Sequence, residues 1–372
     1  MRIITRMNIG GPALQVSMLM NHLNTKEFDH RLYTGNCSTT EANYSESILS
    51  DISTTVIDSF GQDKKFYDQI KSFIFLVKEI RRFKPDIIHT HTAKAGLLGR
   101  VASVVSLKQS IRIHTFHGHL LYGYFGPTKK WFVILTERIL AKFTHKLIAV
   151  GLNVRNDLLN VGIGSKEQFL VIPPGLNISN LYSKFDAKNF YNLDPSRLYC
   201  AFVGRVTQIK RVDRFLEVVE EIKKRNINLD FFIAGDGELL ENCKLIIMKK
   251  SLPVKMLGWQ HDIEKVLSAA DMLIVTSDNE GTPTALIQAG LAGLPVVATR
   301  VGSIPEVIID GVTGLLTSFE VLDIADSIER LVRNQTLRLT VGGAAKQFTQ
   351  QNFGISKFTE SHINLYKSVL KI

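Results

Sequence analysis

Residues 272–288 read MLIVTSDNEGTPTALIQ, an apolar run followed by a polar loop and then by a helical pattern. The run at 272–276 is short and rich in β-branched residues, which is typical of a buried strand. In the loop, Thr282 is a candidate N-cap and Pro283 a candidate first helical residue. The stretch predicts a strand, a polar loop, and a helix whose N-terminus faces that loop.

The same pattern recurs along the chain. In the first half, short apolar runs predict strands at residues 2–5, 31–34, 54–57, 86–90, 111–116, 146–150 and 169–172. In the second half, strands are predicted at residues 199–203, 229–234, 254–257, 272–276 and 296–299. Amphipathic segments lie between them. In residues 66–83, for example, one helix face carries Ile70, Phe73, Ile74, Val77 and Ile80. This alternation predicts an α/β fold of parallel sheets covered by helices on both faces.

The length of the chain predicts two domains. A chain of 372 residues exceeds the size that one hydrophobic core usually supports. Residues 173–195 are rich in Pro, Asn and Ser and lack periodicity, so we place the hinge there. The predicted domains are residues 1–175 and 196–354, and residues 355–372 form a last helical stretch.

Composition and charge limit the class of protein. The net charge of +10 favours an anionic partner, but the basic residues are dispersed, which favours a phosphorylated small molecule over nucleic acid. No stretch approaches the ~18 apolar residues of a membrane span, and the N-terminus lacks the apolar core of a signal peptide. Cys37, Cys200 and Cys243 have neither disulfide nor zinc spacing, so we expect a cytoplasmic protein in a reducing compartment.

Open α/β sheets bind ligands at the carboxyl ends of their strands, so the loops after the strands form the candidate site. The first strand leads into Gly10 and Gly11, where the backbone can approach an anion at the next helix N-terminus. A simple tight turn is the alternative there. After residues 199–203, Arg205 and Lys210 can hold a diphosphate, although solvated loop charges are also common.

The loop after residues 272–276 combines a helix N-terminus with polar side chains. Glu280 on the loop and Gln288 further along the helix are both able to reach hydroxyl groups. The free amides expected to point at a phosphate are those of Gly281, Thr282 and Thr284.

These loops and several ordered motifs resemble glycosyltransferase family four. The second half carries GRVTQIK at 204–210, Glu280 with Gln288 eight positions later, AGLPVVAT at 292–299 and EVIIDGVTGL at 306–315. The first half carries HTHTAKAG at 89–96, HTFHGH at 114–119 and VIPPGL at 171–176. The resemblance spans nearly the full chain and is to a branch found in bacterial surface-polysaccharide clusters. It implies the GT-B fold, with two Rossmann-like domains facing a central cleft, and a transferase that retains anomeric configuration.

Carried over by position, the resemblance gives the second domain the donor site. The phosphate-binding Arg and Lys fall on Arg205 and Lys210. The glutamate that contacts donor-sugar hydroxyls falls on Glu280, and the residue that binds the donor ribose falls on Gln288. The remaining donor-binding positions are Gly258 and Trp259, which match the loop that lines the base, and the helix start at Gly281, Thr282, Pro283 and Thr284.

The first domain contributes fewer residues under this resemblance. The active-site histidine of the family falls on His117, and the glycine loop beside the diphosphate falls on Gly10 and Gly11. The last stretch, residues 355–372, is implied to cross back onto the first domain.

Histidines crowd two predicted strand ends and raise the question of a metal ion. Alternate residues of a strand share a face, so only some of these side chains can converge. The chain also has no two aspartates two positions apart, the arrangement of many metal-dependent sugar transferases. We therefore expect no metal and no cofactor, with cationic side chains and helix amides neutralising the leaving diphosphate. The histidines concerned are His89, His91, His114, His117 and His119.

The expected reaction moves a sugar from a nucleotide-sugar to a saccharide or a polyprenyl-diphosphate-linked saccharide at the inner face of a membrane. A UDP-sugar is expected because UDP donors are common in the resembling branch, and GDP stays open. Gln288 stands where the family usually has glutamate; an amide can still bond a ribose diol. The departure leaves open a non-catalytic nucleotide-sugar-binding relative, and net charge alone supports a nucleic-acid-binding protein.

Residues 122–146 mix aromatic and basic side chains. Such a segment can lie on an anionic membrane surface. It is equally typical of a helix whose apolar face packs on the sheet. The residues concerned are Tyr124, Phe125, Lys129, Lys130, Trp131, Phe132, Arg138, Lys142, Phe143 and Lys146.

Overall fold

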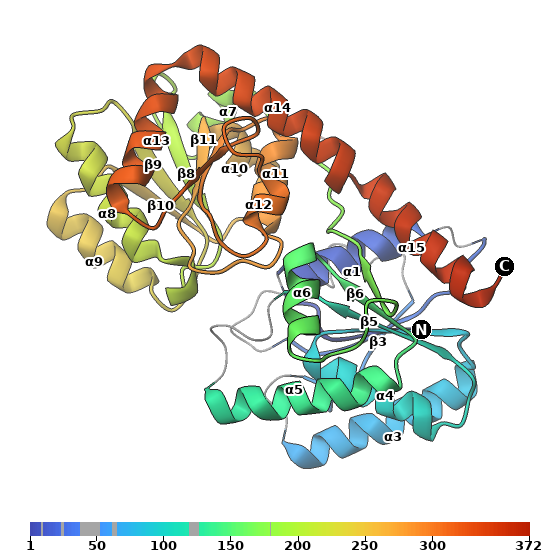
Figure 1. The fold of residues 1–372 in the computed structure, drawn as a ribbon. Helices are drawn as coiled ribbons and strands as arrows, with labels where there is room; N and C mark the ends of the chain where they lie inside the picture. Colours follow the sequence, from blue (N-terminus) through green and yellow to red (C-terminus); the bar gives the residue numbers. More distant parts are fainter. Residues whose placement is uncertain (9, 24–25, 38–52, 62–64, 119–125, 179) are drawn as a thin grey trace. The chain divides into compact units, whose positions relative to one another are not determined.

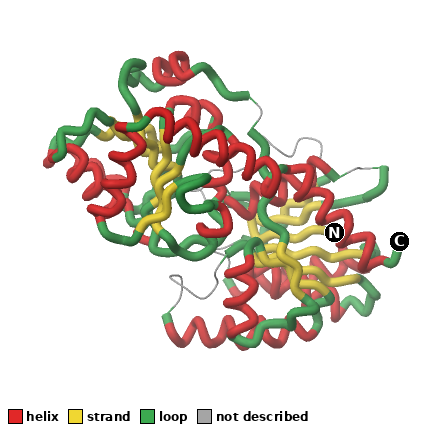
Figure 2. Tube along the Cα trace, turned by 45° about the horizontal axis from the view of Figure 1, so that its top comes forward, coloured by secondary structure: helices red, strands yellow, loops and turns green. Residues whose placement is uncertain are grey.

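The computed structural model describes residues 1–372 except residues 9, 24–25, 38–52, 62–64, 119–125 and 179. The chain forms two compact units (Figure 1). Unit 1 contains Met1–Gly175 and Ile355–Ile372, and unit 2 contains Leu176–Gly354. Each unit is built on one parallel sheet, and helices flank the strands (Figure 2), which confirms the predicted α/β class.

Unit 1 has a seven-stranded parallel sheet with the order β3-β2-β1-β4-β5-β6-β7. Each strand lies within one residue, at either end, of the range predicted from the sequence. The strands are β1 (Arg2–Arg6), β2 (Leu32–Gly35), β3 (Thr54–Val56), β4 (Ile87–His91), β5 (Ile111–Phe116), β6 (Lys146–Ala149) and β7 (Phe169–Val171).

The helices of unit 1 cover its sheet in two layers. Helices α3 (Phe66–Phe83), α4 (Ala93–Val105) and α5 (Pro127–Lys142) each precede a strand nearer the β7 edge, so right-handed connections place them on one face (Figure 1). Helix α6 (Leu152–Asn160) connects β6 to β7. Helix α1 (Gly11–His22) leads the other way and lies on the opposite face, where it contacts α15 (Ile355–Leu370).

Helix α3 has the predicted bounds, and part of its predicted apolar face is buried. Val77 and Ile80 are buried and Phe73 packs against the core, whereas Ile70 and Ile74 are exposed. Leu76, which the predicted face did not include, is also buried. The apolar residues of α3 are too many for one stripe, so the prediction included two residues that the packing leaves exposed.

Unit 2 has a six-stranded parallel sheet with the order β10-β9-β8-β11-β12-β13. Five strands match the predicted ranges, but β13 was not predicted, because its three residues are too few to show a periodic pattern. The strands are β8 (Tyr199–Val203), β9 (Asp230–Ala234), β10 (Val254–Gly258), β11 (Met272–Val275), β12 (Val296–Thr299) and β13 (Leu315–Thr317).

The predicted hinge is largely part of unit 2. Residues 176–195 belong to this unit and contain α7 (Lys184–Phe190). Lys188 on α7 donates to Asp271 over 3.0 Å, and both side chains are buried. A seven-residue helix anchored by a buried ion pair has no apolar periodicity to reveal it. The other helices of unit 2 are η1 (Gln208–Lys210), α8 (Val212–Lys224), α9 (Leu240–Lys250), α10 (Ile263–Ala269), α11 (Thr284–Leu291), α12 (Ile304–Val307), α13 (Val321–Arg333) and α14 (Gln335–Phe353).

Candidate active site

Two loops of unit 2 meet because β8 and β11 are neighbours in the sheet. The loop after β8 passes through η1 into α8, and the loop after β11 leads to α11. The amide of Asp278 donates to the carbonyl of Ile209 over 3.1 Å and joins the two loops. The carboxyl edge of this sheet therefore places residues of 204–211 beside residues of 276–283.

Lys210 and Glu280, both predicted site residues, are in direct contact. Lys210 Nζ lies 2.5 Å from Glu280 Oε1, and Ser277 Oγ donates to the same oxygen over 2.6 Å. Glu280 is only 8% exposed, so its carboxylate needs the opposite charge that Lys210 supplies. The sheet edge thus combines an ammonium group, suited to an anion, with a carboxylate, suited to hydroxyl groups.

The backbone of Glu280 is held by the turn after β12. The amide of Ser303 donates to the carbonyl of Glu280 over 3.1 Å. Gly302 has a φ of 49°, and a Cβ there would lie 1.9 Å from the Glu280 carbonyl oxygen. Only glycine allows this approach.

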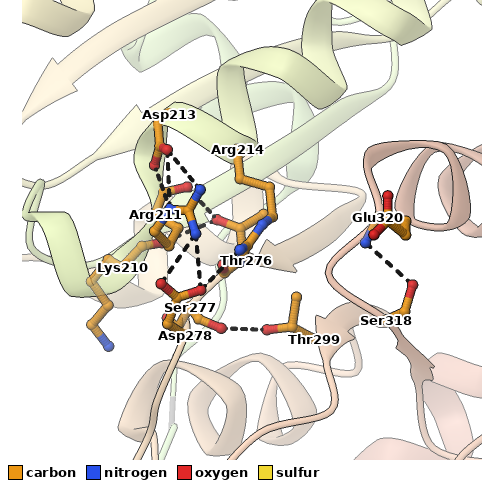
Figure 3. A network of polar contacts seen from close by, with 10 residues as sticks. All are labelled: Lys210, Arg211, Asp213, Arg214, Thr276, Ser277, Asp278, Thr299, Ser318 and Glu320. Atoms are coloured by element: carbon orange, nitrogen blue, oxygen red, sulfur yellow. Dashed lines mark hydrogen bonds and ion pairs between the residues drawn. The ribbon is translucent and has the colours of Figure 1, made fainter. Parts of the chain in front are cut away.

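A second polar network supports the same two loops (Figure 3). Arg211 Nη1 donates to both carboxylate oxygens of Asp278, each over 3.1 Å, and Arg214 Nη2 donates to one of them over 2.9 Å. Arg214 is buried and also donates to the carbonyl of Thr276 over 2.6 Å. The hydroxyl of Thr276 lies 3.1 Å from the carbonyl oxygen of Lys210. Sequence reasoning missed Arg211, Arg214 and Asp278, although Arg211 directly follows a predicted site residue.

Helix α11 begins later than predicted. Pro283 occupies the cap position and Thr284 is the first helical residue, so Thr282 is not the N-cap. Proline is tolerated at a helix start because its missing N–H has no helical partner to lose. The first free amides of the helix are those of Thr284 and Ala285, while Gly281 and Thr282 lie on the preceding loop.

Gln288 lies one turn beyond Thr284 on α11. Both are half-buried, and residues four apart share a helix face. Leu286, Ile287 and Ala289 are buried. Gln288 therefore lies on the side of the helix that is open near its N-terminus.

Glycines lie at the carboxyl ends of three neighbouring strands at this edge. Gly204 follows β8 and Gly235 follows β9, and a Cβ at Gly235 would lie 1.8 Å from the Gly204 carbonyl oxygen. Gly258 ends β10 with a φ of 68°, and the partly exposed Trp259 follows it. Arg205, the second predicted cation, is exposed on the β8 loop.

In unit 1, the predicted glycine loop after β1 leads directly into the N-terminus of α1. Gly10 is the cap residue and Gly11 the first helical residue. The carbonyl of Gly10 accepts the amide of Leu14 over 3.0 Å, which is the first helical bond. The amides of Gly11 and Ala13 precede this bond, and Pro12 has no amide, so anion binding at Gly10 and Gly11 stays a prediction.

The histidines of β4 and β5 form a buried chain. His89 and His91 share one face of β4, with ring centroids 4.3 Å apart. His91 Nδ1 lies 2.9 Å from His117 Nε2. His89 Nδ1 lies 2.8 Å from the hydroxyl of Tyr366 on α15, so the last helix reaches the strand end beside the predicted active-site histidine.

Burial keeps these rings neutral. It lowers the pKa of His117 to about 3 and the pKa values of His89, His91 and His114 far below their usual range. Within the described residues, no group of three or more His, Cys, Asp or Glu side chains is arranged to hold a metal ion. His119 lies outside the described residues.

Helix α5 buries Glu137, Leu140 and Ala141 and presents aromatic side chains outward. Arg100 of α4 donates to both carboxylate oxygens of Glu137 over 2.8 and 2.7 Å, and both side chains are buried. Trp131 is 59% and Phe132 63% exposed. Packing on the sheet therefore does not account for these aromatics. No helix in the described part of the chain is long and apolar enough to cross a membrane. Tyr124 and Phe125 lie outside the described residues.

Known proteins match both halves of the chain. The sequence pattern of Glycosyltransferase Family 4 matches residues 9–180, and that of Glycosyl transferases group 1 matches residues 183–348. The UDP-Gal:alpha-D-GlcNAc-diphosphoundecaprenol alpha-1,3-galactosyltransferase of Escherichia coli is 31% identical over 281 residues, 71% of this chain and 70% of that protein. The capsular polysaccharide biosynthesis glycosyltransferase CapM of Staphylococcus aureus is 22% identical over 83% of this chain and 84% of its own.

A solved structure extends the match to the fold. Anabaena HepE in complex with UDP superposes with a TM-score of 0.82, at 19% identity and over 99% of each chain. The two parallel-sheet units and these matches define a glycosyltransferase of the GT-B type. The chain belongs to glycosyltransferase family four, which confirms the resemblance seen in its motifs.

Proposed function

We propose that this enzyme transfers a sugar from a UDP-sugar to a saccharide or polyprenyl-diphosphate-linked saccharide in surface-polysaccharide synthesis. The contact between Lys210 and Glu280 carries the proposal. A nucleotide-sugar needs a cation for its diphosphate and an acceptor for its sugar hydroxyls, and these two side chains supply both. Two similar proteins support the choice: the name of the Escherichia coli galactosyltransferase includes UDP-Gal and a diphosphoundecaprenol acceptor, and HepE was solved in complex with UDP.

Loss of UDP creates negative charge on the leaving diphosphate, which preorganised donors stabilise. We assign this role to Lys210, Arg205 and the first amides of α11. Glu280 orients the donor sugar, and Gln288 bonds the ribose. For His117 we propose a hydrogen bond to the reacting sugar, since a neutral imidazole can donate or accept one. We expect retention of configuration and no requirement for a metal ion.

The test offers purified enzyme several UDP- and GDP-sugars with a polyprenyl-diphosphate-linked saccharide, with and without EDTA. The proposal expects transfer from a UDP-sugar, an α-linked product from an α-linked donor, and no loss of rate in EDTA. Nucleotide binding without transfer or donor hydrolysis would instead indicate the non-catalytic relative. An inverted product or an EDTA-sensitive rate would overturn those two parts separately.

We also propose that the enzyme works at an anionic membrane surface, at the inner face of the cytoplasmic membrane, with the outer side of α3, α4 and α5 against the lipid. Apolar side chains are exposed on all three helices. Those with large exposure are Phe66, Tyr67, Ile70 and Ile74 on α3, Leu97, Val104 and Val105 on α4, and Trp131, Phe132, Leu135 and Ile139 on α5.

Charge favours the same surface. Helices α3, α4 and α5 together carry ten basic side chains against three carboxylates, so they hold +7 of the chain's net +10. Exposed aromatic residues among basic ones bind the headgroup region of anionic bilayers. An acceptor anchored in lipid would be presented at such a surface.

A further inference from the structure

Arg211 adopts a backbone conformation that normally favours glycine. Its φ of 50° and ψ of 51° are left-handed, at the turn between η1 and α8. Side chains with a Cβ are disfavoured in this region. Glycine would form the same turn without strain. The side chain of Arg211 must therefore make contacts that offset the strain of its backbone.

That side chain connects the two loops of the candidate site. Arg211 Nη1 donates to both oxygens of Asp278, and Arg211 Nε donates to both oxygens of Asp213, all over 3.0–3.1 Å (Figure 3). Arg211 directly follows Lys210, and Asp278 lies two residues before Glu280. The Arg211–Asp278 contact thus lies one residue from the Lys210–Glu280 contact on the first loop and two residues from it on the second.

The other contacts of Asp278 differ from this one. Arg214 is buried, and it also donates to the carbonyl of Thr276, so its removal would leave a buried acceptor unpaired. The amide of Asp278 is already satisfied by the carbonyl of Ile209. Arg211 is partly exposed, so its side chain can be removed with little effect on the core.

We propose that Arg211 is a positioning residue for sugar transfer, whose two-pronged bond to Asp278 fixes the loop carrying Glu280 against the turn carrying Lys210. The inference rests on the proposed function of those two residues. Small displacements of reacting or orienting groups lower enzyme rates strongly, so a loose loop lowers the rate without unfolding the protein.

Arg211→Gly tests the proposal, because it removes the side chain and the backbone strain together. We expect a melting temperature no lower than that of the parent and a kcat at least tenfold lower. Ser251→Gly is the matched control: Ser251 has a φ of 47°, is exposed and caps α9. It relieves the same strain and should leave kcat unchanged. Arg211→Lys keeps the charge but loses the two-pronged geometry, so its kcat should fall between the two.

A kcat of Arg211→Gly within twofold of the Ser251→Gly value would overturn the proposal. If Arg211→Gly does not fold, Asp278→Asn decides in its place: a tenfold loss of kcat supports the proposal, and full activity overturns it. Absence of transfer in the parent and in Ser251→Gly would instead refute the proposed function. UDP affinity by calorimetry then tests Arg211, with at least threefold weaker binding expected for Arg211→Gly only, and equal affinities overturning the proposal.

Discussion

Lys210 and Glu280, seventy residues apart in the chain, form an ion pair with 2.5 Å between Nζ and Oε1. Neither residue could reach the other unless β8 and β11 were neighbours in the sheet. The strand order of the sheet therefore brings the two residues together. It places a cation and a carboxylate at one strand edge, which is where open α/β sheets bind ligands.

Both loop cations should contribute to transfer. Lys210→Ala removes a charge that the geometry aims at Glu280 and, in our proposal, at the diphosphate. Loss of a contact that strengthens with developing charge costs about 2–4 kcal/mol, or roughly 30- to 1000-fold in kcat/KM. Arg205→Ala should lower kcat/KM in the same range although Arg205 is exposed. Lys249→Ala on α9 is the control, and values within threefold of it would remove either residue from the site.

Substitution of Gln288 should reduce UDP affinity more than it reduces the rate of sugar transfer. Gln288→Ala is expected to weaken UDP binding by about 1–2 kcal/mol, the usual cost of a lost polar contact. Gln288→Glu should keep or tighten binding, because a carboxylate makes stronger bonds than an amide. Glu280→Gln should instead reduce transfer more than UDP affinity. Calorimetry with UDP and with the UDP-sugar separates these outcomes, and unchanged UDP binding by Gln288→Ala would exclude Gln288 as a ribose ligand.

His117 should act as a neutral ring. Because burial lowers its pKa to about 3, His117 stays unprotonated throughout pH 6–8 and adds no ionisation to the rate profile there. His117→Ala should lower kcat at least tenfold while the circular dichroism spectrum and melting temperature stay close to those of the parent. Full transfer by this variant, or a rate that follows protonation of His117 near pH 6.5, would contradict the assignment.

Unit 1 should lose stability in mild acid before unit 2 does. Seven of its histidines have lowered pKa values in the folded state, so below about pH 6.5 the unfolded chain binds protons that the folded unit does not. The free energy of unfolding therefore falls as pH decreases from 7 to 5, by up to about 1.4 kcal/mol per pH unit for each histidine. Unit 2 has only the exposed His261 and is the internal control. Hydrogen exchange followed by mass spectrometry should show faster opening of β4 and β5 at pH 5; equal changes in both units would contradict this.

The basic side chains of α5 should govern binding to lipid. Reversal of Lys129, Lys130 and Lys142 to Glu should weaken co-sedimentation with anionic vesicles, since each basic residue near such a surface contributes about 1 kcal/mol. The control reverses the same number of lysines on α9 of unit 2, namely Lys244, Lys249 and Lys250. Equal loss of binding in both variants would indicate a general charge effect, and unchanged sedimentation of the α5 variant at low salt would remove the proposed surface.

Local patterns predicted the strands and the loops that carry the candidate site, because buried strands and loop glycines leave clear signals. Contacts that depend on tertiary structure leave no such signal in the sequence. The sequence places Arg211 and Asp278 sixty-seven positions apart, and only the strand order brings them together. The start of α11 was misplaced by one residue because Thr282 and Pro283 both fit a helix start, and the observed geometry has Pro283 as the cap. Tyr366 reaches His89 from the last helix, a contact that no periodicity could predict.

The most direct test is a double-mutant cycle on kcat/KM for sugar transfer from the UDP-sugar, with Lys210→Ala, Glu280→Gln and the two combined. If both residues contact each other and hold one donor, each single change should lower kcat/KM at least 30-fold. The double change should then cost clearly less than the product of the two losses, because coupled residues are not additive. Single variants within threefold of the parent, or losses that simply multiply, would contradict the account.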